Sequence, residues 1–226
     1  MKFENRPLFT TTSLKTPEDI IICEKQESMY CGRHVLRAVS QRLDLFTDEY
    51  LKEVAVNLAT LEHIYSHGES LCPKNYYFEN TGEYNIDVLK ASLLNIFNID
   101  LIQINKLQQN TSPLHSLILS NIQFVQAFII QQDYHYYCLR RFRLTHSYFF
   151  KIDSKNITYH ERIEHDKILN YLDSLLQLGA NIYITIEHMA QDEQYEISLI
   201  NIEKALWPFP EAPADLEHLT ILQEKK

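Results

Sequence analysis

Residues 24–34 read EKQESMYCGRH, and this stretch places a cysteine near the start of a predicted helix. Apolar residues recur from Val35 to Leu43 at the spacing that gives a helix one buried face. Backbone N–H groups at a helix N-terminus stabilise a thiolate, the nucleophilic form of cysteine. Gln26, five residues before Cys31, can donate a hydrogen bond to the oxyanion of a tetrahedral intermediate. Taken alone, Cys31 also fits a small buried structural residue.

A second stretch, residues 131–155, reads QQDYHYYCLRRFRLTHSYFFKIDSK. His135 opens one predicted strand and Asp153 closes the next, so a hairpin would bring them side by side. The Asp153 carboxylate can then orient the imidazole while its other nitrogen faces a thiol, the arrangement of a catalytic triad. Taken alone, His135 also fits a hydrogen-bonded histidine in an aromatic sheet, and Asp153 fits a turn residue before Ser154.

Helical periodicity dominates the first half of the chain, and strand-forming residues dominate the second half. Helices are predicted to begin near Cys31, at Thr47 or Asp48, and at Ile86, the last ending at Phe97. A fourth helix is predicted over 161–178 and would end at Gly179 in the left-handed conformation. Strands are predicted over 99–105, 124–130, 135–144, 148–153 and 181–187. This order predicts an α+β fold with an antiparallel sheet, interrupted by a long loop over 66–83.

Composition excludes several classes of function. The net charge of -9 has the wrong sign for a protein that neutralises nucleic-acid phosphates. Only 4 glycines are present, and no phosphate-binding glycine motif occurs. The four cysteines (Cys23, Cys31, Cys72, Cys138) lack C-x-x-C spacing, which argues against a zinc site and a disulfide framework. We therefore expect no metal and no cofactor.

The two ends of the chain differ from the middle. Residues 1–18 are polar and are predicted to be a loose leader without the apolar core of a signal peptide. No run of about 18 apolar residues occurs that could span a membrane. Residues 201–226 are predicted to be a C-terminal appendage, because three prolines within 208–213 exclude a regular element there. Its Trp207 and Phe209 can dock on the domain or on another protein, and we expect docking on the domain.

The two stretches together resemble the Josephin family of deubiquitinases. In that family a glutamate-lysine-glutamine run precedes the cysteine by the spacing seen here from Glu24 to Cys31. A histidine at the start of a strand and an asparagine or aspartate in an N-L-[DN]-S stretch resemble His135 and Ile152-Asp153-Ser154. The similarity covers about 19–200 and implies a papain-like cysteine protease fold with a helical subdomain. The chain departs from the family at Tyr136, where tryptophan is frequent.

The resemblance implies a mechanism and a partner. Cys31 would attack the carbonyl of the C-terminal glycine of ubiquitin, His135 would be the general base and Asp153 would orient it. Gln26 and the Cys31 backbone amide would hold the oxyanion. The region at about 48–80 corresponds to a hairpin that can close over the ubiquitin tail. The aromatic residues Tyr76, Tyr77 and Phe78 are candidate ubiquitin contacts there, although at least two of them also fit a local core.

Three other interpretations remain open on sequence alone. The chain can be an inactive ubiquitin-binding module, a papain-like amidase or peptidase of other specificity, or a scaffold with an incidental cysteine. The cysteine pattern favours a reduced, cytosolic protein, and the host cytosol if the source is an intracellular bacterium.

Overall fold

The computed structural model describes residues 21–66, 76–78, 81–104, 116, 118, 120–143, 147–157, 160–189 and 199–209. The predicted leader at 1–18 and the last residues of the predicted appendage lie outside this part. The helices are α1 (Cys31–Ser40), α2 (Asp48–Tyr65), α3 (Ile86–Phe97), α6 (Ile168–Gln177) and α7 (Leu199–Ala205), with short 3-10 helices η4 (Ile122–Phe124) and η5 (His165–Lys167). The strands are β1 (Tyr77–Phe78), β2 (Glu83–Tyr84), β3 (Ile99–Gln103), β4 (Ala127–Gln132), β5 (His135–Arg140), β6 (Tyr148–Ile152), β7 (Arg162–Glu164) and β8 (Asn181–Glu187).

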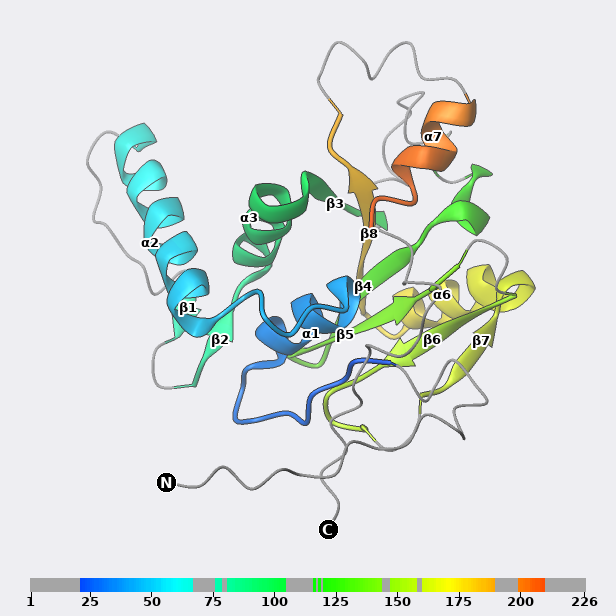
Figure 1. Cartoon of the computed structure of the whole chain (residues 1–226), viewed down its shortest axis with the longest axis horizontal. Helices are drawn as coiled ribbons and strands as arrows, with labels where there is room; N and C mark the ends of the chain where they lie inside the picture. The colour runs from blue at the N-terminus through cyan, green and yellow to red at the C-terminus, as the bar shows by residue number, and fades with distance from the viewer. Residues whose placement is uncertain are drawn as a thin grey trace, which may run out of the picture.

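A six-stranded antiparallel sheet forms the centre of the molecule (Figure 1), in the order β3-β8-β4-β5-β6-β7. Strand β8 lies next to the edge strand β3 and pairs with both β3 and β4. A separate two-stranded ribbon pairs β1 with β2. The antiparallel sheet and the α+β class predicted from the sequence are both confirmed.

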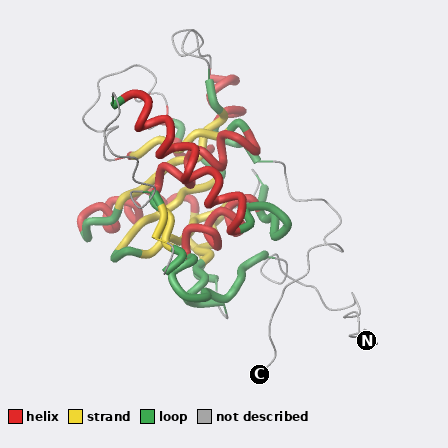
Figure 2. Tube along the Cα trace, turned by 90° about the vertical axis from the view of Figure 1, so that its left-hand side faces the viewer, coloured by secondary structure: helices red, strands yellow, loops and turns green. Residues whose placement is uncertain are grey.

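Helices cover both faces of the sheet, and each face has its own apolar cluster. On one face, α1, α2 and α3 bury Leu36, Leu51 and Leu89 together with Ile129 and Phe150 of the sheet. Figure 2 looks onto this helical side, with the six-stranded sheet behind it. On the other face, α6 and α7 pack over alternate strand residues such as Phe128, Ile130 and Ile182. This alternation is the period of two that side chains follow along a strand.

The ends of several helices carry the signals that the sequence predicts. Thr47 caps α2 by accepting a hydrogen bond from the backbone N–H of Tyr50. Helix α3 has the predicted bounds, with Asn85 as its N-cap. Gly179 has a φ of +83° and follows α6, as predicted. Ala180 N–H then bonds the carbonyl of Leu175, which satisfies one of the last carbonyl groups of the helix.

Other predicted boundaries are wrong. The helix predicted over 161–178 begins only at Ile168. Arg162–Glu164 form β7 instead, because Ile163 alone is buried and its two neighbours are exposed, which is the pattern of an edge strand. Strand β4 begins at Ala127, three residues later than predicted, because Ile122–Phe124 make a 3-10 turn. Helix α1 ends at Ser40 where Gln41 has a φ of 58°, so Leu43 lies beyond it.

The described part of the C-terminal segment belongs to the core. Ile202 and Leu206 are fully buried in the cluster under α6 and α7, and Phe209 is buried in the cluster on the other face. The predicted docking is therefore confirmed for Phe209. The domain limits at 19–200 stay a prediction, while residues 202–209 contribute buried side chains to both apolar clusters.

No helix within the described part of the chain is long and apolar enough to cross a membrane.

Candidate active site

Cys31 is the first residue of α1. It therefore lies at the helix end where the backbone N–H groups of the first turn have no partner within the helix. Tyr30 at the N-cap makes no side-chain capping bond, so the positive end of the helix is not neutralised by a cap at this point. The next residue must be small: a Cβ on Gly32 would lie 3.3 Å from Leu89 Cδ1 and 3.4 Å from Tyr84 Cβ. Gly32 therefore lets the Cys31 end of α1 pack closely against α3 and β2.

His135 and Asp153 meet at one end of the sheet. His135 opens β5 and Asp153 directly follows β6, and these two strands are paired with Cys138 opposite Ile152. His135 Nε2 lies 2.7 Å from Asp153 Oδ1. Because a carboxylate accepts, Nε2 carries the hydrogen of this bond, and Nδ1 remains for another group. Asp153 Oδ1 also accepts from the Lys155 backbone N–H at 2.9 Å, which fixes the carboxylate.

The sulfur of Cys31 is the neighbour that acts on the same imidazole. Burial on its own would lower the pKa of His135, but the bond to Asp153 and then the interaction with the Cys31 thiol raise the pKa above its ordinary value. Within the described part of the chain, His135 Nδ1 is buried and makes no hydrogen bond, so this nitrogen is left free to accept a proton. Two side chains, Cys31 from α1 and Asp153 from the turn after β6, thus act on the imidazole that opens β5.

Gln26 lies beside the same turn. Its backbone N–H donates to the carbonyl of Ser154 at 2.8 Å, and the Ser154 hydroxyl donates to Gln26 Oε1 at 3.2 Å. Gln26 Nε2 donates to the carbonyl of Ser28 at 2.9 Å. The segment before α1 is therefore joined to the residue after Asp153, which brings the predicted oxyanion donor to the same end of the sheet as the imidazole.

Comparison with protein families shows a match: a model described as Josephin covers residues 26–186, more than half of the chain. The chain belongs to the Josephin family. The matched range begins at Gln26 and includes Cys31, His135 and Asp153. Members of the family are generally cysteine deubiquitinases, and Josephin domains generally bind ubiquitin. A search of curated proteins found no match.

The carboxyl group of the Josephin site is held in its charged form. Burial raises the pKa of Asp153, but the bonds from His135 and from the Lys155 backbone N–H outweigh this and leave the pKa below its ordinary value. The raised pKa of His135 and the lowered pKa of Asp153 both mean that the pair favours imidazolium beside carboxylate. The site is thus suited to stabilise an imidazole that has just accepted a proton.

This pair predicts a measurable change on Asp153→Asn. The amide keeps the shape but loses the charge, so the pKa of His135 is expected to fall, as seen by NMR titration of its ring protons. The unfolding free energy should also depend on pH. The raised pKa of His135 stabilises the fold below about pH 6.5, and this stabilisation is lost as pH rises through the folded pKa. The lowered pKa of Asp153 stabilises the fold above about pH 4. The unfolding free energies of the two proteins should therefore differ most between these limits; an unchanged His135 titration would contradict the pairing.

The aromatic group predicted to contact ubiquitin has mixed surroundings. Tyr76 and Tyr77 are half-buried against the helical cluster, and Tyr77 stacks on Tyr84 with ring centroids 5.0 Å apart. Phe78 is 53% exposed on β1. Two of the three thus contribute to local packing, and Phe78 offers its ring to solvent.

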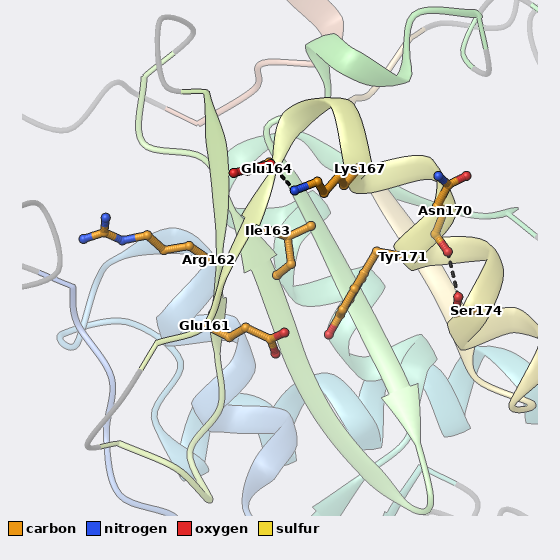
Figure 3. Close-up of a pocket in the computed structure, with 8 residues that line it drawn as sticks. All are labelled: Glu161, Arg162, Ile163, Glu164, Lys167, Asn170, Tyr171 and Ser174. Atoms are coloured by element: carbon orange, nitrogen blue, oxygen red, sulfur yellow. Dashed lines mark hydrogen bonds and ion pairs between the residues drawn. The ribbon is translucent and has the colours of Figure 1, made fainter.

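A shallow pocket of about 540 Å³ lies elsewhere, between β7 and α6 (Figure 3). The Glu161 carboxylate and the Tyr171 hydroxyl point toward each other across it, and Lys167 forms an ion pair with Glu164 at its rim. Ile163 at its base belongs to the apolar cluster on the α6 face, whereas Cys31 belongs to the cluster on the opposite face. None of the four predicted site residues lines this pocket.

Sequence reasoning assigned no role to Ser154, Glu24 or Arg37, although all three bond to the site or its neighbours. Ser154 was adjacent to Asp153 in the motif, which was the available signal. The ring of His34 is also buried, one turn after Cys31 on α1.

Proposed function

We propose that this Josephin chain is a cysteine-dependent deubiquitinase that hydrolyses the isopeptide or peptide bond after the C-terminal glycine of ubiquitin. The observation that carries the proposal is the single imidazole of His135, which bonds Asp153 at 2.7 Å and whose pKa is raised, against burial, first by that bond and then by the Cys31 thiol. A sulfur at a helix N-terminus, a base beside it and a carboxylate behind the base are the parts that thiol acyl transfer needs.

The first half-reaction forms an acyl enzyme. The Cys31 thiol gives its proton to the ring nitrogen of His135 that does not bind Asp153, and the sulfur attacks the glycine carbonyl carbon. The carbonyl electron pair moves to the oxygen, where N–H groups of Gln26 and of the Cys31 backbone donate hydrogen bonds. When the carbonyl re-forms, the C–N bond breaks and the amine takes the proton from His135. The product is a thioester between Cys31 and ubiquitin.

The second half-reaction restores the thiol. Neutral His135 takes a proton from water as the hydroxyl oxygen attacks the thioester carbon, and the C–S bond then breaks. The sulfur recovers the proton and ubiquitin leaves with a free carboxyl group. Asp153 keeps the imidazole oriented in both halves and stabilises its charged form. Because the three described cysteines are free thiols, we place this chemistry in a reducing compartment such as the cytosol.

The test is incubation of the purified chain with a panel of ubiquitin dimers of different linkage, beside fluorogenic peptides and small amides. We expect release of mono-ubiquitin from at least one dimer and no turnover of the peptides. Turnover of peptides with all dimers intact would instead indicate a papain-like peptidase of other specificity. Measurable ubiquitin binding without any cleavage, and without a covalent adduct from a ubiquitin C-terminal electrophilic probe, would indicate an inactive binding module.

A further inference from the structure

The segment that carries Gln26 is held from the α1 side by a buried histidine. His34, which is 4% exposed, lies one turn after Cys31 on α1. Its Nδ1 is 3.0 Å from Glu24 Oε2, and its Nε2 accepts the backbone N–H of Glu27 at 3.4 Å. A ring that accepts at Nε2 and faces a carboxylate at Nδ1 is neutral, with its hydrogen on Nδ1. His34 thus bonds residues on both sides of Gln26.

Glu24 is in turn fixed by a second side chain of α1, the cation of Arg37. Arg37 Nη1 lies 2.8 Å from Glu24 Oε1 and 3.0 Å from Oε2, and Arg37 Nε donates to the carbonyl of Leu45. Burial raises the pKa of Glu24, but the bonds from His34 and Arg37 outweigh it and keep the carboxyl charged. The anchor of the segment is therefore a charge-assisted contact, which is stronger than a neutral hydrogen bond.

The same segment is held from the other side by Ser154, which is 8% exposed. Its hydroxyl donates to Gln26 Oε1 and its carbonyl accepts from the Gln26 backbone. A glutamine amide has an acceptor end and a donor end, and only the NH2 end can stabilise an oxyanion. Ser154 occupies the oxygen end and the Ser28 carbonyl takes one hydrogen of the nitrogen end. Both contacts favour the same orientation of the amide and leave the second N–H hydrogen for the substrate.

We propose that His34 and Ser154 are positioning residues that together hold the Gln26 amide with its NH2 end toward the scissile carbonyl. This rests on the proposed function, because it assigns how the oxyanion donor of that reaction is oriented. Ser154 follows Asp153 directly, so one turn orients both the imidazole and the amide. Donors that are oriented before the reaction need no rearrangement as charge develops, and for this reason they act on kcat.

A double-mutant cycle tests the proposal with a fluorogenic ubiquitin C-terminal amide as substrate. Gln26→Ala is expected to lower kcat on the order of 10²-fold, as loss of one oxyanion donor does. Ser154→Ala and His34→Gln are each expected to lower kcat roughly tenfold with KM unchanged, because they misorient the donor without removing it. In the Gln26→Ala background neither change should have a further effect. Ser154→Thr, which keeps the hydroxyl, should restore kcat.

The control is Ser40→Ala. Ser40 is also 8% exposed, and its hydroxyl donates to the carbonyl of Arg37 inside α1, so kcat should not change. Additive losses in the cycle, or the same loss in Ser40→Ala, would overturn the proposal, since general loosening of the fold would act equally in both backgrounds. Ser154→Ala with Ser154→Thr carries the test if His34→Gln does not fold.

A second readout separates this proposal from the proposed function. If the wild-type chain does not cleave the ubiquitin amide, the deubiquitinase assignment fails, and the Gln26 side-chain amide is followed by 15N NMR instead. A single sharp pair of NH2 resonances in the wild type that shifts or broadens in Ser154→Ala supports the positioning role. An identical pair in both proteins refutes it.

Discussion

Cys31→Ala is expected to abolish cleavage of ubiquitin dimers and labelling by a ubiquitin C-terminal electrophilic probe. In the proposed mechanism the substitution removes the sulfur that forms the acyl enzyme, so turnover should fall on the order of 10³-fold or more. His135→Ala should have a similar effect, because the sulfur loses the base that accepts its proton. The two changes should not be additive, since the two side chains act as one unit.

The matched control is Cys23→Ser. Cys23 is also a free thiol, but burial, followed by the charges of Asp153 and Glu24, raises its pKa to about 12. A thiol with such a pKa carries almost no thiolate near neutral pH and should not react with the probe. The expected result is full labelling of Cys23→Ser and mass-spectrometric location of the adduct on Cys31. An adduct on Cys23, or unchanged turnover in His135→Ala, would contradict the assigned roles.

The placement of the proposed site residues could be predicted because each leaves a local signal. Cys31 begins a periodic apolar stripe, and the pair of strands that ends in Asp153 brings that residue to His135. The bond between them is diagonal across the β5–β6 pair, which follows from the antiparallel register alone. These are relations along one helix and one hairpin, where sequence spacing determines proximity.

Contacts between distant segments could not be predicted in the same way. Ser154 bonds Gln26 across 128 residues, and nothing in the composition of either segment specifies that pairing. Strand β7 was missed for a related reason: a three-residue edge strand with one buried side chain gives less signal than the helix that follows it. Its place is determined by β6, to which it pairs.

The C-terminal segment provides a further long-range case. Three prolines within 208–213 predict that this stretch forms no regular helix or strand. Phe209 is nevertheless buried in the core. Gln126 makes this possible, because its side chain replaces the backbone partner that a strand would provide. Its Nε2 donates to the Phe209 carbonyl at 3.0 Å, and its Oε1 accepts the Phe209 N–H at 2.7 Å. The Gln126 backbone N–H also donates to the Leu206 carbonyl at 2.8 Å.

Phe209→Ala is therefore expected to be strongly destabilising, by about 3–5 kcal/mol, as for other fully buried phenylalanines. The ring is 1% exposed and packs edge-on against Phe97, with centroids 5.6 Å apart. The Arg140 guanidinium lies 4.7 Å from the centre of the same ring, and burial lowers the pKa of Arg140 to about 9. Loss of the ring removes a cation–π contact from a cation that is already poorly solvated.

Chemical denaturation of Phe209→Ala beside Phe78→Ala measures this contribution. Phe78 is 53% exposed, so the same truncation there should change the unfolding free energy by less than about 1 kcal/mol. The total stability of a domain is about 5–15 kcal/mol, and loss of Phe209 should therefore leave a marginal fold. Equal losses at the two positions would mean that Phe209 does not pack as described. The expected inequality implies that the family-matched range, which ends at residue 186, is not sufficient for a stable domain, because the rings and aliphatic side chains that close its core come from residues 202–209.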